Sequence, residues 1–141
     1  MELQEVQRIW GNTIDEIADI IAELMEDVRR RGVKYAEETD LGITVVEEIC
    51  PEAAEGHGED WGELVRVNMH EALPEVLMEA ARRAGLTPES YRIWLSGDTY
   101  FYEVMAAADG RRAVLTFDVQ LDVDSCEAML WRVCVDLTTA I

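Results

Sequence analysis

The cysteine, histidines and glutamate in the middle of the chain are the residues whose types could hold a metal ion. Cys50, His57, Glu59 and His70 carry side chains that zinc accepts as ligands. Their spacing matches no usual zinc pattern, and His57 lies between two glycines. The sequence therefore predicts no metal site and no cofactor.

A second set of carboxylates could do acid–base work or bind Mg²⁺ or Ca²⁺. Asp118, Asp122 and Asp124 lie on a predicted strand and at its end. Alternation along a half-buried strand also places acids on its solvent-facing side. We therefore interpret these three acids as surface residues of a strand rather than as catalytic or metal-binding residues. The chain has no G-x-S-x-G, P-loop or G-x-G-x-x-G motif. We expect a protein that is not an enzyme.

The charge of the chain limits its partners. The formal net charge is −18 at pH 7, and Lys34 is the only lysine. Phosphates repel such a chain, which argues against direct binding to nucleic acid or to an anionic membrane. The charge favours a basic protein partner, bound cations or a saline environment. It also fits a host whose proteins are all acidic.

The acids gather in two places. No basic residue lies between Lys34 and Arg66, although that stretch carries ten acids. The outer face of the first predicted helix carries a second group, spaced three or four residues apart. The candidate partner-binding residues are Asp15, Asp19, Glu23, Glu26, Asp27, Glu37, Glu38, Asp40, Glu47, Glu48, Glu52, Glu55, Glu59 and Asp60.

The compartment is predicted from the cysteines and the N-terminus. Cys50, Cys126 and Cys134 form no C-x-x-C pair and are interpreted as reduced thiols in core or neutral positions. The first residues lack the basic and apolar regions of a signal peptide, and no apolar run is long enough to span a membrane. These features predict a cytoplasmic protein.

Two helices are predicted before residue 86. Apolar residues from Leu3 to Val28 recur every three or four positions, which predicts one helix over about 2–31 rather than two shorter helices. A helix of about 45 Å exceeds a small domain, so part of its apolar face could pack on a second subunit. A second helix is predicted over about 60–84, with a kink or break near His70 caused by Pro74.

The stretch between these helices is ambiguous. Ile43 to Val46 is β-branched and could be a strand, but apolar residues from Ile43 to Ala54 could also line a helix interrupted at Pro51. We favour helix or irregular structure over residues 33–58.

Strands are predicted after residue 87. Segments 91–95, 99–107, 113–122 and 127–137 alternate or carry hairpin signals, and the last could instead be a helix capped by Ser125. The order of elements predicts one α+β domain over 1–141, helical over about 1–86 and β over about 90–137. Two long N-terminal helices would pack on a C-terminal antiparallel sheet of three to four strands.

The acid pattern suggests a function of the binding class. The chain is predicted to be a non-enzymatic inhibitor that engages a basic, nucleic-acid-binding protein by imitating nucleic-acid charge, as phage inhibitors and immunity proteins do. The alternative is an ordinary cytosolic ligand-binding or chaperone-like dimer whose acidity reflects a saline or generic host. A homodimer through the first helix fits either hypothesis.

Overall fold

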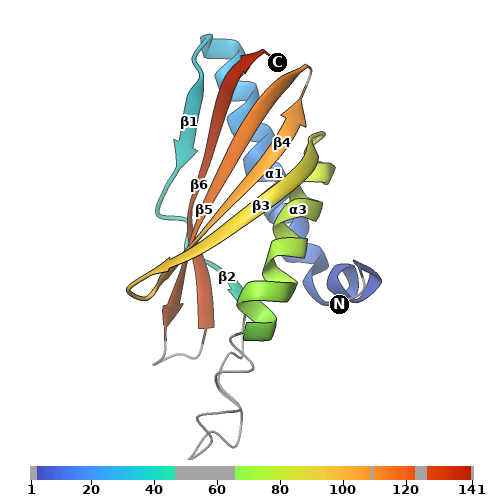
Figure 1. Ribbon diagram of the computed structural model, residues 1–141, viewed down its shortest axis with the longest axis vertical. Helices are drawn as coiled ribbons and strands as arrows, with labels where there is room; N and C mark the ends of the chain where they lie inside the picture. Colours follow the sequence, from blue (N-terminus) through green and yellow to red (C-terminus); the bar gives the residue numbers. More distant parts are fainter. Residues whose placement is uncertain (1–2, 47–65, 109, 123–126, 141) are drawn as a thin grey trace, which may run out of the picture.

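The computed structural model describes residues 3–46, 66–108, 110–122 and 127–140 (Figure 1). These residues form a six-stranded antiparallel sheet with helices against one of its faces. The elements follow in the order α1 (Leu3–Arg31), β1 (Tyr35–Glu38), β2 (Ile43–Val46), the π-helix η1 (Arg66–Ala72), α3 (Leu73–Arg83), β3 (Thr87–Ser96), β4 (Thr99–Ala108), β5 (Arg111–Asp122) and β6 (Glu127–Ala140).

The strand order of the sheet is β1-β6-β5-β4-β3, and β2 also pairs with β6. β1 pairs with residues 133–136 and β2 with residues 128–130, so the two short strands lie end to end along one edge of β6. Asp40, in the turn between them, adopts a φ of 57°, which aspartate tolerates better than most residues. β3 forms the opposite edge.

The predicted first helix is confirmed as a single α1. Its apolar residues from Ile14 to Val28 are buried against the sheet and α3, as their three-to-four spacing requires. Three arginines occupy the last turn, where they stabilise the negative end of the helix dipole. Gly32 follows with a φ of 66°, a left-handed conformation that glycine adopts without a Cβ penalty.

The break expected near His70 takes the form of a π-helix. Residues 66–72 are π-helical, and α3 begins at Leu73 with Pro74 in its first turn. Proline has no N–H to donate, so it fits a first helical turn and disrupts an α-helical interior. The Tyr102 hydroxyl donates a hydrogen bond of 2.5 Å to the carbonyl oxygen of Met69, which fixes η1 to the sheet.

The core lies between the helices and one face of the sheet. On β4 and β5 every second side chain is buried, and the intervening side chains are only partly buried. Tyr102 and Phe117 are the largest fully buried side chains in the described part of the chain. The other face of the sheet carries no helix among the described residues (Figure 1).

The predicted fold class is wrong. The structure is mostly sheet, with six strands instead of three to four, one long N-terminal helix and an α3 of 11 residues. The error lies in residues 35–46, where we favoured helix or irregular structure and the structure has β1 and β2. Both strands are four residues long and are stabilised by pairing with β6. For Ile43 to Val46 the structure has the strand that its β-branched residues allowed as the alternative. The strand prediction for the last segment is confirmed, since β6 is a strand.

Candidate functional site

The predicted partner-binding acids fall into three groups. Five lie on α1, two lie on β1, and Asp40 is exposed in the turn that follows β1. The remaining six lie outside the described residues: Glu47, Glu48, Glu52, Glu55, Glu59 and Asp60.

Part of the α1 stripe is neutralised within the chain. Asp15 accepts a hydrogen bond of 2.5 Å from Arg83 of α3, and this ion pair joins the two helices. Asp27 pairs with Arg30 and Arg31 one turn further along α1. No ion pair joins Asp19, Glu23 or Glu26 to another described residue, and all three are exposed. The unneutralised stripe is therefore shorter than the sequence suggests.

β1 brings its own acids next to this shorter stripe. An open groove of about 550 Å³ lies between α1 and β1. Its charged lining consists of Glu23, Glu26, Asp27, Arg30, Glu37 and Glu38. Two acidic segments that are separate in the sequence thus border one surface, which we call the α1–β1 groove. Arg30, the basic residue of this lining, pairs with Asp27.

Glu37 and Glu38 are neighbours in sequence but point to opposite faces of the sheet. Glu38 is on the same face as Ala36, which is buried, and that face is turned toward α1. Glu37 is paired with Cys134 in the β1–β6 register and contacts side chains on the open face. Of these two neighbours, only Glu38 has no ion pair among the described residues.

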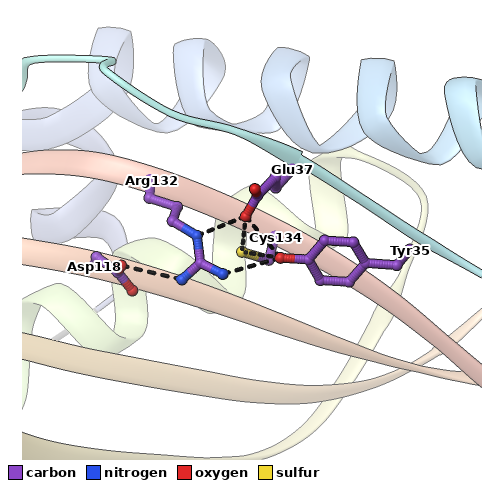
Figure 2. A network of polar contacts seen from close by, with 5 residues as sticks. All are labelled: Tyr35, Glu37, Asp118, Arg132 and Cys134. Atoms are coloured by element: carbon purple, nitrogen blue, oxygen red, sulfur yellow. Dashed lines mark hydrogen bonds and ion pairs between the residues drawn. The ribbon is translucent and has the colours of Figure 1, made fainter.

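Glu37 belongs to a polar network on the open face of the sheet (Figure 2). Arg132 of β6 donates one hydrogen bond of 2.8 Å to Glu37 and another of 3.2 Å to Asp118 of β5. A third nitrogen of Arg132 lies 2.9 Å from the Tyr35 hydroxyl, which lies 2.7 Å from Glu37. The network therefore connects three adjacent strands through one guanidinium group.

The hydrogens of this network can be assigned from its geometry. A tyrosine hydroxyl has one hydrogen, and its shortest contact with an acceptor is to Glu37. The hydroxyl oxygen then accepts from Arg132, and the Cys134 thiol, 3.7 Å away, donates to the same Glu37 oxygen. Glu37 thus accepts from three donors, one of them a guanidinium group, and such contacts favour its ionised form.

These contacts shift the acid–base properties of the network. The hydrogen bonds from Tyr35 and Arg132 lower the pKa of Glu37 below its usual value of 4.5. The Cys134 sulfur, 3.3 Å from the Tyr35 hydroxyl, the Glu37 carboxylate and burial together raise the pKa of Tyr35 to about 12. The carboxylates beside Arg132, Glu37 first, raise its pKa, so its charge is permanent at any physiological pH.

The network is not arranged for nucleophilic chemistry. Burial raises the pKa of the Cys134 thiol, and a thiol held in its protonated form is a poor nucleophile. Tyr35 is held protonated as well. One oxygen of Asp118 is buried without a hydrogen-bond partner, while the other binds Arg132. These groups hold β1, β5 and β6 together.

Within the described part of the chain, the remaining chemistry-bearing residues form no group that could hold a metal ion. His70 lies 3.3 Å from the Tyr100 hydroxyl and packs edge-on against that ring. Its proposed companions Cys50, His57 and Glu59 lie outside the described residues. Asp118 belongs to the network, Asp122 ends β5, and Asp124 lies outside the described residues.

Sequence reasoning missed Tyr35, Arg132 and Cys134 as members of one cluster. They come from opposite ends of the chain and meet only through the β1–β6 register. One signal was available, because Arg132 and Cys134 alternate with apolar residues on the wet face of the last strand. An arginine on that face beside a strand carrying Asp118 predicts a cross-strand ion pair.

No helix in the described part of the chain is long and apolar enough to cross a membrane.

Comparison with known proteins yields two distant structural likenesses. No protein-family model matches the chain, and no curated protein matches it. The first likeness is to the thermo- and acido-stable ORF-99 from the archaeal virus AFV1, at 10% identity and a TM-score of 0.42, covering 88% of this chain and 97% of that chain. The second is to ORF14 from Sulfolobus Islandicus Filamentous Virus, at 10% identity and a TM-score of 0.42, covering 87% and 85%. Likenesses this distant carry no argument about function.

Proposed function

We propose that the chain is a non-enzymatic, cytoplasmic binding protein that engages a basic, nucleic-acid-binding protein. Its carboxylates occupy the place that phosphates take in the partner's own ligand. The α1–β1 groove and the exposed part of the α1 stripe make the contact. The partner's surface is then blocked for nucleic acid for as long as the complex lasts.

One observation carries the proposal. Glu23 and Glu26 of α1 border the same groove as Glu38 of β1, and no ion pair joins these three to a described basic residue. Asp19 extends the row by one helical turn beyond Glu23, about 6 Å along the axis. Asp19, Glu23 and Glu26 are exposed and Glu38 is half-buried, so a lysine or arginine of a partner can reach the α1 acids without any rearrangement of this chain.

The physical role of such a row is to set the association rate and the choice of partner. Clustered charge of one sign raises the rate at which an oppositely charged surface arrives, and salt weakens this effect. Arginine side chains suit the groove because a guanidinium group binds carboxylates through two parallel hydrogen bonds. The same charge, within a net −18, repels nucleic acid and anionic membranes.

The arrangement of the basic residues supports this assignment. Arg132, Arg83 and Arg30 each hold acids of their own chain. The groove acids Glu23, Glu26 and Glu38 have no such arginine among the described residues, and Glu23 and Glu26 are exposed. Carboxylates left in this way repel one another and stabilise nothing internally, so a partner is the simplest reason for them.

The test is affinity capture from the native host with quantitative mass spectrometry. The bait chains are the wild type, Glu23→Lys/Glu26→Lys and the matched control Glu89→Lys/Asp136→Lys. Both variants change the net charge by the same amount, but the control reverses exposed acids outside the groove. We expect the groove variant to lose basic nucleic-acid-binding proteins that the wild type and the control retain.

Two results would contradict this function. One is capture of the same proteins by the groove variant and the wild type. The other is equal loss in both variants, which would assign the binding to overall charge rather than to the groove. Circular dichroism of the three chains confirms that each is folded before capture.

A further inference from the structure

The free edge of the sheet at β3 carries an unusual concentration of exposed apolar side chains. Tyr91 and Trp94 are each 41% exposed and Leu95 is 53% exposed. They account for half of the exposed large hydrophobic residues in the described part of the chain. Nearly every residue of β3 is exposed, and its only described strand partner is β4 (Figure 1).

Natural sheets usually protect such an edge. Short edge strands, lysines, prolines and bulges prevent one edge from pairing with another. β3 has ten residues and no lysine, and its proline and its bulge both lie near its start, at Pro88 and between Pro88 and Ser90. From Ser90 to Ser96 the strand pairs with β4 without a bulge, so neither a bulge nor a proline protects this part of the edge.

The charge of β3 also differs from that of the whole chain. Glu89 and Arg92 are its only charged residues, so the strand is neutral in a chain of net charge −18. Arg92 pairs with Glu103 of β4 and lies 5.4 Å from the centre of the Trp94 ring. Trp94 in turn stacks on Phe101. A second copy of this chain therefore meets less repulsion at β3 than at the acid-bearing surfaces.

We propose that β3 pairs with β3 of a second copy in antiparallel orientation, which forms a continuous sheet across a homodimer. The apolar residues of α1 from Ile14 to Val28 are buried within one chain. This part of α1 therefore cannot form the dimer interface through its apolar face, whereas the exposed β3 edge can.

The hairpin geometry selects the register of this pairing. Gly97, with a φ of 64°, and Asp98 form a two-residue turn closed by the pair Ser96 and Thr99. The closing pair of such a turn is hydrogen bonded, and bonding alternates along an antiparallel pair. The backbone groups of Tyr91, Ile93 and Leu95 therefore point away from β4 and toward an incoming strand.

A pairing centred on Ile93 fits the side chains. It places Ile93 opposite Ile93 of the second copy, and Tyr91 opposite Leu95, on the helix-facing side. On the open face it places Arg92 opposite Trp94 of the second copy, where a cation–π contact can form. No two like charges face each other across this pairing, and cross-strand pairs of these types stabilise sheets.

The salt dependence of the dimer follows from its neutral interface within an acidic chain. Two chains of net charge −18 repel each other at long range, and salt screens this repulsion while leaving apolar contacts intact. We expect self-association to strengthen as salt rises. Binding of a basic partner in the α1–β1 groove is expected to weaken with salt, so the two interactions are distinguishable.

The first experiment is sedimentation equilibrium of the purified chain over a salt series. We compare the wild type with Tyr91→Lys/Leu95→Lys and with Val33→Lys, which adds a lysine at an exposed apolar residue away from β3. The edge variant should raise the dimer Kd at least about tenfold, and Val33→Lys should leave it unchanged. Both variants make the net charge of the chain less negative, which weakens the long-range repulsion between two copies and favours the dimer. A change in net charge therefore cannot explain a higher dimer Kd of the edge variant.

The second experiment tests the register with chains in which Cys50 and Cys126 are replaced by serine. Arg92→Cys and Trp94→Cys chains are oxidised separately and as a mixture. The proposed register brings these two positions opposite each other, so disulfide-linked dimers should form in the mixture and not in either chain alone.

Three results overturn the proposal. These are a wild-type chain that stays monomeric at every salt concentration, an edge variant that dimerises as well as the wild type, and cross-linking of either cysteine variant with itself in place of the mixture. Pairing of β3 with a strand of another protein would appear as the first of these results.

Discussion

Glu37 and Glu38 are adjacent residues of one strand, yet they belong to two regions that differ in whether their carboxylates are paired. The open-face network satisfies Glu37 with an arginine, a tyrosine hydroxyl and a thiol. The α1–β1 groove gathers Glu38 with Glu23 and Glu26 and leaves them without an ion pair among the described residues. Strand alternation produces the separation. The acids of this chain are therefore of two kinds: carboxylates that hold strands together, and carboxylates that have no ion pair among the described residues.

Removal of Arg132 should affect stability most. Arg132→Ala leaves Glu37 without its cation and Asp118 without a partner for either oxygen, so we expect the free energy of unfolding to fall by about 1–3 kcal/mol. The control is Arg92→Ala, which breaks an exposed pair with Glu103 and should cost about 0.2–1 kcal/mol. Urea unfolding measures both. Equal losses would show that the network is an ordinary surface ion pair.

A smaller effect is expected when the two neighbouring glutamates are compared directly. Glu37→Gln should lower the urea midpoint at neutral pH, while Glu38→Gln should leave it unchanged or raise it slightly. Because the folded pKa of Glu37 lies below 4.5, its contribution is present above about pH 4.5 and is lost as the pH falls through the lowered pKa. The Glu37→Gln and wild-type curves should therefore converge in acid. A constant gap between them at all pH values would contradict the assigned hydrogen bonds.

The smallest effect is expected in the groove. Glu23 lies four residues from both Asp19 and Asp27, so Glu23→Gln removes like-charge repulsion of about 0.2–0.5 kcal/mol for a pair. We expect a slight rise in thermal stability at low salt that disappears in molar salt, where the repulsion is screened. A fall in stability after Glu23→Gln would show that Glu23 has a structural role.

The predictability of the fold depended on the range of the interactions involved. α1 was predictable because its packing repeats every three or four residues, and β3 to β6 were predictable because each neighbouring pair is joined by a short connection. β1 was not predictable, since Tyr35–Glu38 has only one buried residue and becomes a strand only by pairing with β6. The groove forms because that pairing places β1 beside α1. Its acidic residues could be identified from the sequence, but their arrangement around one groove could not.

The pairing of β1 with β6 also has a consequence for how the chain folds. Glu37 and Arg132 are 95 residues apart. During synthesis β1 therefore cannot pair with β6 until the residues of β6 have been made. Contacts between such distant residues slow folding, and unpaired strands are vulnerable to incorrect pairing in the meantime. Charged residues in a waiting strand discourage such pairing. The two adjacent glutamates of β1 can thus discourage incorrect strand pairing before β6 is available, and in the folded chain Glu37 joins the network and Glu38 lines the groove.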